Sequence, residues 1–223
     1  MTMRQTLALA ALAGAAALGP AVATGQDYDE RVSIALGAME PDGPASLGLL
    51  VSFNYGRRVS PGLRVGAEVQ WYRRQHDAHY LLVGDAAAAT GAIIESTATT
   101  QLFPLLGTAD YFFPIGRGDA ELFFGAGAGL DYLRVKHFPV GLAPGSSLPE
   151  GTLLREFTRN AAGIGWVVRA GFSGRPGRTV GAVFLEGFYK GSSIDADDDL
   201  RVGAPADVAS RAAGFGFRVG FRF

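Results

Sequence analysis

The residue types that could do chemistry are few, and the first group lies in a polar stretch of the chain. His76, Asp77 and His79 place three candidate metal ligands within four residues. Imidazole and carboxylate groups are ordinary zinc ligands. Three candidates on one loop are nevertheless a weak signal, because a solvated loop tip has the same composition. We interpret them as a solvated loop and predict no metal site.

A second group is acidic and occurs near the carboxyl end of the sequence. It consists of Asp195, Asp197, Asp198 and Asp199. Carboxylates at this density could collect calcium or bridge phosphate groups through divalent ions. The spacing lacks the glycine and the terminal glutamate of an EF-hand loop, so a solvated acidic loop is the better interpretation. We predict no cofactor.

A third group could supply a base and a nucleophile. His137 precedes a Phe-Pro pair, and Ser146, Ser147 and Glu150 follow within the same connection. Nucleophilic catalysis needs a histidine in contact with a serine or a carboxylate. These residues are near one another only in sequence, so we predict no catalytic residue and no enzyme activity.

The amino end has the pattern of a secretory signal peptide. Arg4 supplies the positive charge, residues 7–18 are an unbroken Ala/Leu/Gly run, and Ala21-Val22-Ala23 has the small-x-small form of a cleavage site. A run of this length is well short of the roughly 20 residues that span a bilayer. The sequence therefore predicts a cleaved signal over residues 1–23 and one domain over residues 24–223.

Composition narrows the function classes further. The 20 basic and 21 acidic residues nearly balance, whereas a nucleic-acid partner would need clustered positive charge. The chain has no cysteine, so no disulfide can form, and this suits passage through an oxidising compartment. With 32 glycines and 48% hydrophobic residues, the composition is unusual for a soluble enzyme.

Alternation with a period of two dominates the sequence from Glu30 onward. In the last twelve residues, 212–223, large apolar residues alternate with glycine and arginine, which indicates a β-strand. Similar segments, each bounded by turn residues, predict strands at about 31–39, 47–56, 63–72, 97–113, 121–132, 163–172 and 179–190. No segment after residue 23 could be a spanning helix, so a membrane location requires a closed sheet. The prediction is an all-β fold, an eight-stranded antiparallel up-and-down transmembrane β-barrel.

The connections between these strands alternate in length. Tight turns follow the second, fourth and sixth strands, while long connections are predicted at about 73–96, at about 136–160 and after Ile194. Short turns on one side and long loops on the other are typical of outer-membrane barrels, with the long loops outside the cell. A lipocalin-type soluble barrel gives no reason for this asymmetry.

The polar faces of the strands carry charges that lipid would not tolerate. An ionised group at mid-depth facing lipid costs roughly 2 to 4 kcal/mol, so these residues should point inward and pair. The predicted lumen charge ladder is Arg64, Glu68, Asp110, Glu121, Asp131, Arg169, Glu186, Arg218 and Arg222. We expect Arg64 to pair with Glu68, and Arg169 or Arg218 with Glu121 or Glu186. The predicted outward aromatic girdle is Tyr55, Trp71, Tyr111, Phe113, Tyr132, Phe172 and Tyr189.

The signal peptide, the alternation, the loop asymmetry and the terminal Phe223 together resemble the small bacterial outer-membrane β-barrel proteins of the OmpA/OmpX transmembrane-domain type, over about residues 28–223. The resemblance implies export to the periplasm and insertion in the outer membrane of a Gram-negative cell, in contact with lipid and lipopolysaccharide. It also implies recognition by the barrel assembly machinery through Phe215, Phe217, Phe221 and Phe223. Where that family's terminal pattern usually has glycine, this chain has Arg218. We expect a monomer and no nucleic-acid partner.

The same resemblance leaves the role open. Members of the class are membrane-integrity proteins, adhesins, loop-displaying binders or narrow channels. We expect a structural or surface-binding role on the long outer loops, since bulky inward residues should block the lumen. The alternative is a narrow pore or a transporter of small apolar molecules. A lipid A-modifying enzyme is disfavoured because His137 lacks the His-x-Ser pattern of the lipid A deacylase family.

Overall fold

The structure is a computed structural model of the chain. It describes residues 30–42, 47–82, 92–116, 120–142, 156–175, 181–194 and 213–223. The predicted signal peptide at residues 1–23 lies outside this part, as do Asp195, Asp197, Asp198 and Asp199 and the candidates Ser146, Ser147 and Glu150. Among the described residues, no helix is long and apolar enough to cross a membrane.

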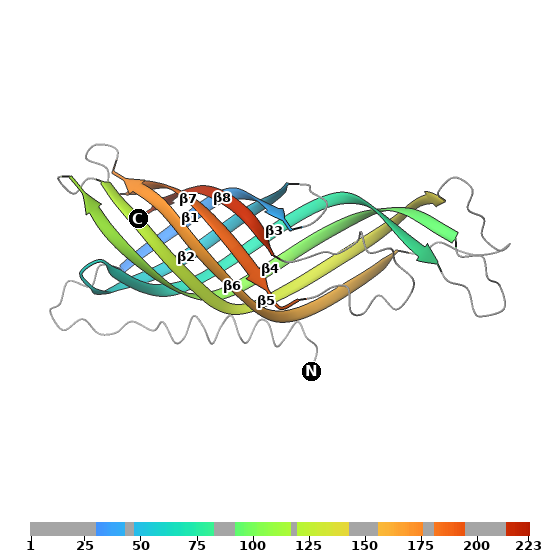
Figure 1. Cartoon of the computed structure of the whole chain (residues 1–223), viewed down its shortest axis with the longest axis horizontal. Helices are drawn as coiled ribbons and strands as arrows, with labels where there is room; N and C mark the ends of the chain where they lie inside the picture. Colours follow the sequence, from blue (N-terminus) through green and yellow to red (C-terminus); the bar gives the residue numbers. More distant parts are fainter. Residues whose placement is uncertain are drawn as a thin grey trace.

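Eight antiparallel strands form one closed sheet (Figure 1). Each strand pairs with its sequence neighbours, and β1 closes the ring by pairing with β8. The strands are β1 (Glu30–Pro41), β2 (Gly48–Ser60), β3 (Leu63–Leu82), β4 (Ala92–Ile115), β5 (Ala120–Leu142), β6 (Phe157–Gly174), β7 (Ala182–Ser192) and β8 (Gly214–Arg222). The prediction of an eight-stranded up-and-down barrel is confirmed.

The closing seam between β1 and β8 has the same face alternation as the rest of the barrel. Leu36 faces Val51 on β2 and Val219 on β8, and all three side chains are on the outer surface. The Cα partner of Ile34 on β8 is Phe221. Closure leaves no unpaired edge along this seam, which is what hydrocarbon demands of a spanning sheet.

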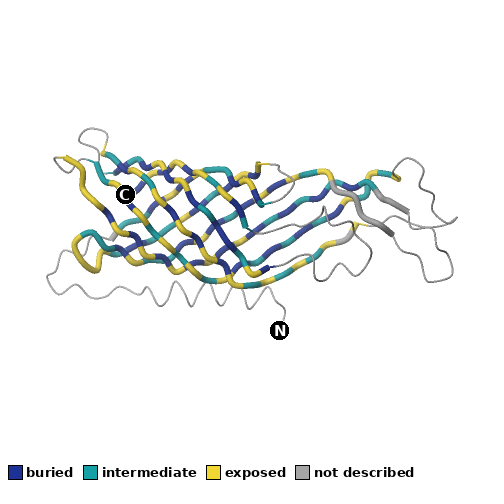
Figure 2. Tube along the Cα trace, viewed as in Figure 1, coloured by how far each residue is buried: buried dark blue, intermediate teal, exposed yellow. Residues whose placement is uncertain are grey.

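Buried and exposed residues alternate along the strands of the barrel (Figure 2), and the two faces that they form differ in side-chain type. The outer face carries exposed apolar side chains such as Leu130, 62% exposed, and Phe217, 57% exposed. The inner face carries the buried charges together with buried apolar residues. This is the reverse of a soluble barrel and is what a lipid solvent selects.

Four strands are longer than the sequence predicts. β3 continues to Leu82 and β4 begins at Ala92, so most of the connection predicted at 73–96 is strand. Likewise β5 continues to Leu142 and β6 begins at Phe157, inside the connection predicted at 136–160. The prediction of long loops was wrong here. Beyond Tyr72 the described side chains of β3 are mostly polar, whereas in β5 the exposed Phe138, Val140 and Leu142 keep the apolar alternation beyond Lys136.

The long strands give the barrel two unlike ends. Beyond the ends of β1, β2, β7 and β8, strands β3 to β6 continue together as a curved sheet at the right of Figure 1. We call this extension the protruding sheet. The opposite, short-turn end holds the tight connections that follow β2, β4 and β6. At two of these turns Gly62 and Gly116 have positive φ, 85° and 62°, a conformation that glycine adopts without a Cβ penalty.

Pro104 is accommodated within β4 without a change of register. The Cα partners Val69 and Leu105 on one side of it, and Tyr72 and Leu102 on the other, follow the same register. On its other side Pro104 is paired with Asp131 of β5. The proline therefore interrupts the pairing with β3 locally and does not create a bulge.

Candidate functional site

The barrel interior is organised around Glu68, which is completely buried. Its carboxylate contacts the guanidinium groups of Arg169 and Arg218. The amide of Gln70 donates a hydrogen bond of 2.6 Å to the same carboxylate, and the amide of Asn54 lies at 3.4 Å. A charge bridged by two arginines is what allows a carboxylate to remain ionised in a site without water.

Each of the two arginines also holds a second carboxylate. Arg169 binds Asp110 through two parallel hydrogen bonds, both of 2.7 Å. Arg218 donates from Nε to Glu186 at 2.8 Å. We call these five residues, from β3, β4, β6, β7 and β8, the central network. It cross-links five strands through the lumen.

A separate buried ion pair joins β7 to β5. Lys190 Nζ lies 2.7 and 2.8 Å from the two carboxylate oxygens of Asp131, and each residue is only 1% exposed. Sequence reasoning placed Asp131 in the lumen but missed Lys190. Continuing the alternation of β7 from Glu186 through Phe188 would have placed Lys190 on the inner face.

Glycines on neighbouring strands make room for these side chains. A Cβ added at Gly125 would overlap the Asp110 carboxylate and would lie 3.0 Å from Arg169 Nε. A Cβ at Gly165 would overlap the carboxylate of Asp131. The inward glycines of β5 and β6 therefore form the surfaces against which the buried ion pairs pack.

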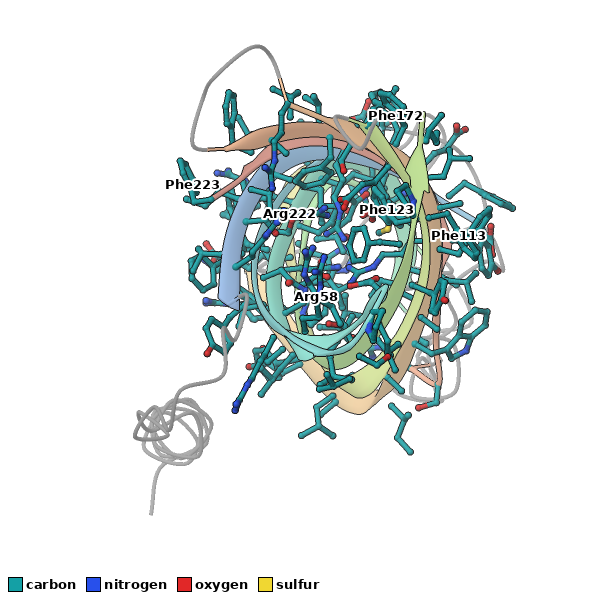
Figure 3. All side chains as sticks on the ribbon, turned by 90° about the vertical axis from the view of Figure 1, so that its left-hand side faces the viewer. Arg58, Phe113, Phe123, Phe172, Arg222 and Phe223 are labelled. Atoms are coloured by element: carbon teal, nitrogen blue, oxygen red, sulfur yellow. The ribbon has the colours of Figure 1, made fainter. Side chains whose placement is uncertain are left out.

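Toward the short-turn end, arginines pack on aromatic rings. The Arg222 guanidinium lies 4.7, 5.3 and 5.2 Å from the ring centres of Phe112, Phe123 and Phe184, and that of Arg64 lies 4.4 Å from Phe112. We call these five residues the arginine–aromatic layer. Figure 3 looks into this end of the barrel: Phe123 and Arg222 lie within the ring of strands, whereas Phe113, Phe172 and Phe223 lie outside it.

Toward the protruding sheet, the lumen is filled by apolar side chains. The largest of them are almost fully buried and come from all sides of the barrel: Met39, Leu50, Tyr72, Leu102, Leu106, Leu133, Val167 and Phe188. Cavities of about 20 Å³ remain at the level of Asp110 and Arg222, room for about one water each. Among the described residues, side chains pack the interior of the barrel and leave cavities the size of single waters.

The structure places the predicted ladder residues as follows. Eight of the nine are buried inside the barrel, and Glu121 is partly exposed near the short-turn end, where Ser173 Oγ donates to it at 3.4 Å. Of the expected pairings, the contact between Arg218 and Glu186 is present. Glu68 contacts Arg169 and Arg218, and Arg169 is also paired with Asp110, partners that the sequence did not suggest.

The predicted girdle and assembly residues belong to the outer face. Tyr111, Phe113 and Phe172 are exposed there, and Tyr55, Trp71, Tyr132 and Tyr189 are partly exposed. Sequence reasoning did not include Trp166, whose ring centre lies 5.5 Å from that of Tyr189, or Phe103, 6.3 Å from Tyr132. The residues expected to be read during assembly, Phe215, Phe217, Phe221 and Phe223, are all exposed on the outer face.

The histidines considered as ligands or bases lie in the protruding sheet. His137 is buried on the inner face of β5, and Ala98 of β4 is the Cα partner of both His137 and His76. Asp77 is exposed, and the side chain of His79 lies outside the described part. Burial, with Arg74 and His137 nearby, lowers the pKa of His76 to about 4, and burial beside Arg159 lowers the pKa of His137. Within the described residues, no three His, Cys, Asp or Glu side chains are grouped to hold a metal ion.

Apolar outer surface, charged interior and closure of eight strands define a transmembrane β-barrel. Its eight antiparallel strands are joined in sequence order, which is the up-and-down arrangement.

Comparison with known proteins finds similar structures but no similar sequence. No family model matches the chain, and no curated protein matches it. The chain is similar to the crystal structure of Neisserial surface protein A, with 14% identity, coverage of 86% of this chain and 94% of that chain, and a TM-score of 0.42. It is also similar to Ail, the attachment invasion locus protein of Yersinia pestis, solved in complex with the heparin analogue sucrose octasulfate, with 11% identity, 89% and 100% coverage and a TM-score of 0.46. The N-terminal β-barrel domain of Pseudomonas aeruginosa OprF gives 10% identity, 88% and 100% coverage and a TM-score of 0.37.

Proposed function

We propose that this chain is an integral outer-membrane protein with a surface-binding role, and that the protruding sheet is the part that binds. The observation that carries the proposal is the length of β3 to β6 beyond the lipid-facing band. Residues 74–82 of β3 alone correspond to about 30 Å of strand. A chain with only a structural role in the bilayer does not need this extension.

The end of the lipid-facing band is marked by one row of polar residues across four strands. Arg73, Gln101, Arg134 and Asn160 are successive Cα partners from β3 to β6. On the lipid side of this row lie the aromatic rings of Phe103 and Tyr132. Aromatic side chains favour the interface, and guanidinium groups bind phosphate. We place the lipopolysaccharide phosphates at Arg73 and Arg134.

The protruding sheet offers unpaired strand edges above this row. Pairing between β2 and β3 ends at Leu49 and Arg73, so residues 74–82 of β3 pair only with β4 within the described chain. On the other side, pairing between β6 and β7 begins at Gly165, which leaves the start of β6 paired only with β5. Unpaired edges of this kind accept an added strand. The partner we propose is an extended segment of another protein.

The rival role, a narrow pore or a transporter of small apolar molecules, requires a continuous path through the lumen. The central network and the apolar residues beside it fill the barrel at mid-height. Cavities of about 20 Å³ leave room for single waters and not for a column of them. The packed lumen therefore favours the binding role.

One labelling experiment tests the orientation and the role together. The natural chain has no cysteine, so a single Asp77→Cys substitution gives a unique label site on the exposed face of the protruding sheet, and Ser60→Cys gives a matched site at the short-turn end. On intact cells, a bulky membrane-impermeant maleimide should react at residue 77, and at residue 60 only after lysis. Cells labelled at residue 77 should adhere less to protein-coated surfaces than unlabelled cells. Labelling at residue 60 alone would contradict the orientation, and unchanged adherence after complete labelling at residue 77 would contradict the role.

A further inference from the structure

The protruding sheet ends at β3 on one side, and the register shows which backbone groups of β3 are open there. The Phe112 N–H donates to the carbonyl of Gly62, just before β3, at 2.7 Å, and the pairing of β3 with β4 keeps that register to the end of β3. Backbone groups of successive residues in a strand point to opposite sides, so the even-numbered residues of β3 bond to β4. The N–H and C=O groups of Gln75 and Asp77 therefore point to the side where pairing with β2 has ended at Arg73.

The opposite edge of the protruding sheet, along β6, is less accessible. The Ile164 N–H donates to Ser193 Oγ at 2.8 Å and the Ser193 N–H donates to the Ile164 carbonyl at 2.7 Å, so the chain after β7 occupies the edge at this point. The next edge-facing residues of β6 are Ala162 and Asn160, and Asn160 belongs to the polar row that ends the lipid-facing band. In β3 the edge-facing residues after Arg73 all lie beyond that row. The β3 edge is therefore the more accessible of the two to a partner outside the membrane.

The outer face beside the β3 edge carries negative charge. Asp77 is exposed there, and within the described residues its carboxylate is in no ion pair. Of the cations on this face, Arg73 is four residues away along β3, and Lys136 of β5 is bonded to Glu156.

A second carboxylate lies on the same face of β4. Glu95 is half-buried and diagonal to Asp77, because it is the Cα partner of His79, two residues along β3. The side chain of His79 lies outside the described part. Diagonal neighbours of this kind are about 7 to 8 Å apart, so the two carboxylates form one negative region beside the edge.

The backbone and the charge together decide what can bind here. Open N–H and C=O groups along an edge bind an extended segment through main-chain hydrogen bonds. A residue directly opposite Asp77 on the added strand has its Cβ atom about 4.5 to 5.5 Å from that of Asp77. A lysine or arginine at this position pairs with the carboxylate, whereas an aspartate or glutamate is repelled by it.

We propose that the β3 edge binds an extended segment of a partner protein, which runs antiparallel to β3 and places a basic side chain opposite Asp77. Antiparallel pairing continues the ladder that β2 forms with β3 lower down. The inference rests on the proposed surface-binding role, and it adds the edge, the strand direction and the charge of the partner.

Backbone hydrogen exchange of the full barrel in lipid nanodiscs, followed by NMR, tests the edge directly. The probe is a short blocked peptide in which lysine alternates with valine, and its control has glutamate in place of lysine. In the free protein the amides of Gln75 and Asp77 should exchange fast, whereas that of His76, which bonds to β4, should be protected. The lysine peptide should protect Gln75 and Asp77, and the glutamate peptide should bind at least fivefold more weakly.

Three variants separate the backbone contribution from the charge. Asp77→Pro removes an N–H that points to the open edge, so it should abolish binding of the lysine peptide while the amide of His76 stays protected. Asn160→Pro removes the corresponding N–H from the β6 edge and should leave binding unchanged. Asp77→Asn keeps the N–H and should weaken binding of the lysine peptide by about two- to fivefold, the effect of one cross-strand charge pair.

Several results would overturn the proposal without touching the surface-binding role. They are protection of Gln75 and Asp77 in the free protein, which would mean that another segment already covers the edge, equal binding of the two peptides, binding of neither peptide at millimolar concentration, and loss of binding in Asn160→Pro instead of Asp77→Pro. The adherence of cells labelled at residue 77 tests the role itself. Unchanged adherence together with peptide binding at β3 would refute the role and leave the strand-binding edge in place.

Discussion

The buried pair of Lys190 and Asp131 is the sharpest place to measure what holds the lumen together. Both residues are 1% exposed, and the ammonium group is bonded to both carboxylate oxygens. Asp131→Asn removes the negative charge and leaves the ammonium buried, while Lys190→Gln leaves the carboxylate buried. The double variant contains two neutral amides that can still hydrogen-bond to each other.

The expected magnitudes follow from that burial. Removing one partner of a buried ion pair leaves an uncompensated charge and costs about 3 to 5 kcal/mol, whereas replacing both partners is often close to neutral. We therefore expect each single variant to lose about 3 kcal/mol or more and the double variant to lose about 1 kcal/mol. The coupling energy is the sum of the two single losses minus the loss of the double variant, and should therefore be about 5 kcal/mol or larger.

An exposed pair of the same chemistry provides the control. Lys136 Nζ lies 2.6 Å from Glu156 Oε1, and the two side chains are 32% and 47% exposed. A surface pair of this kind is worth only about 0 to 1 kcal/mol despite the similar distance. Both cycles can be measured by urea unfolding in lipid vesicles, followed by tryptophan fluorescence and by the heat-modifiable gel shift of folded barrels. If the coupling energy of the buried pair is no larger than that of the exposed pair, burial is not what sets the strength of the lumen contacts.

Two further predictions concern the glycine surfaces and the protruding sheet. Gly125→Ala should destabilise the barrel by about 2 kcal/mol in the same urea assay, because the added methyl group displaces Asp110 from Arg169. Gly187→Ala is the control and should be close to neutral, since its Cβ meets nothing within 4 Å. Equal effects of the two substitutions would contradict the packing argument. The second prediction concerns His76, whose pKa is about 4 in the folded sheet and about 6.5 in the unfolded chain. As the pH falls, the unfolded chain therefore takes up the proton first. The contribution of His76 to the stability of the sheet is complete above about pH 6.5 and declines toward pH 4. Protease resistance of the sheet should show this decline. His76→Gln should reduce it, leaving the part due to His137, whose pKa is also lowered by burial; an unchanged decline would contradict the assignment.

The alternation of side chains predicted which residues enter the lumen because a period of two is a property of each strand alone. Glu68, Arg169 and Arg218 could be assigned to the interior in this way. Their pairing could not, because Glu68 and Arg218 are 150 residues apart and meet only through the stagger of the closed barrel. Sequence reasoning could compare only residues on one strand, so it paired Glu68 with Arg64 of β3. In the structure, Arg169 of β6 and Arg218 of β8 contact Glu68 across the lumen.

The protruding sheet was missed for a different physical reason. Within lipid, one face of a strand must be apolar, so alternation is visible in the sequence. Beyond Arg73 and Arg134 the outer face meets water, and polar residues such as Gln75 and Lys136 occupy positions that would otherwise be apolar. Along β3 the pairing therefore continues without the apolar pattern, whereas along β5 the outward Phe138, Val140 and Leu142 preserve that pattern beyond Lys136.

The side chains that fill the lumen limit which parts of the barrel are open to a binding partner. Charged residues cannot face lipid, so they enter the interior, and there each needs a partner because little water remains to solvate it. Glu68, Asp110 and Glu186 are bonded to Arg169 and Arg218, so buried ion pairs occupy the middle of the barrel. Under the proposed binding role, recognition therefore falls to the end where β3 to β6 extend beyond the other strands, with edges that are unpaired within the described chain.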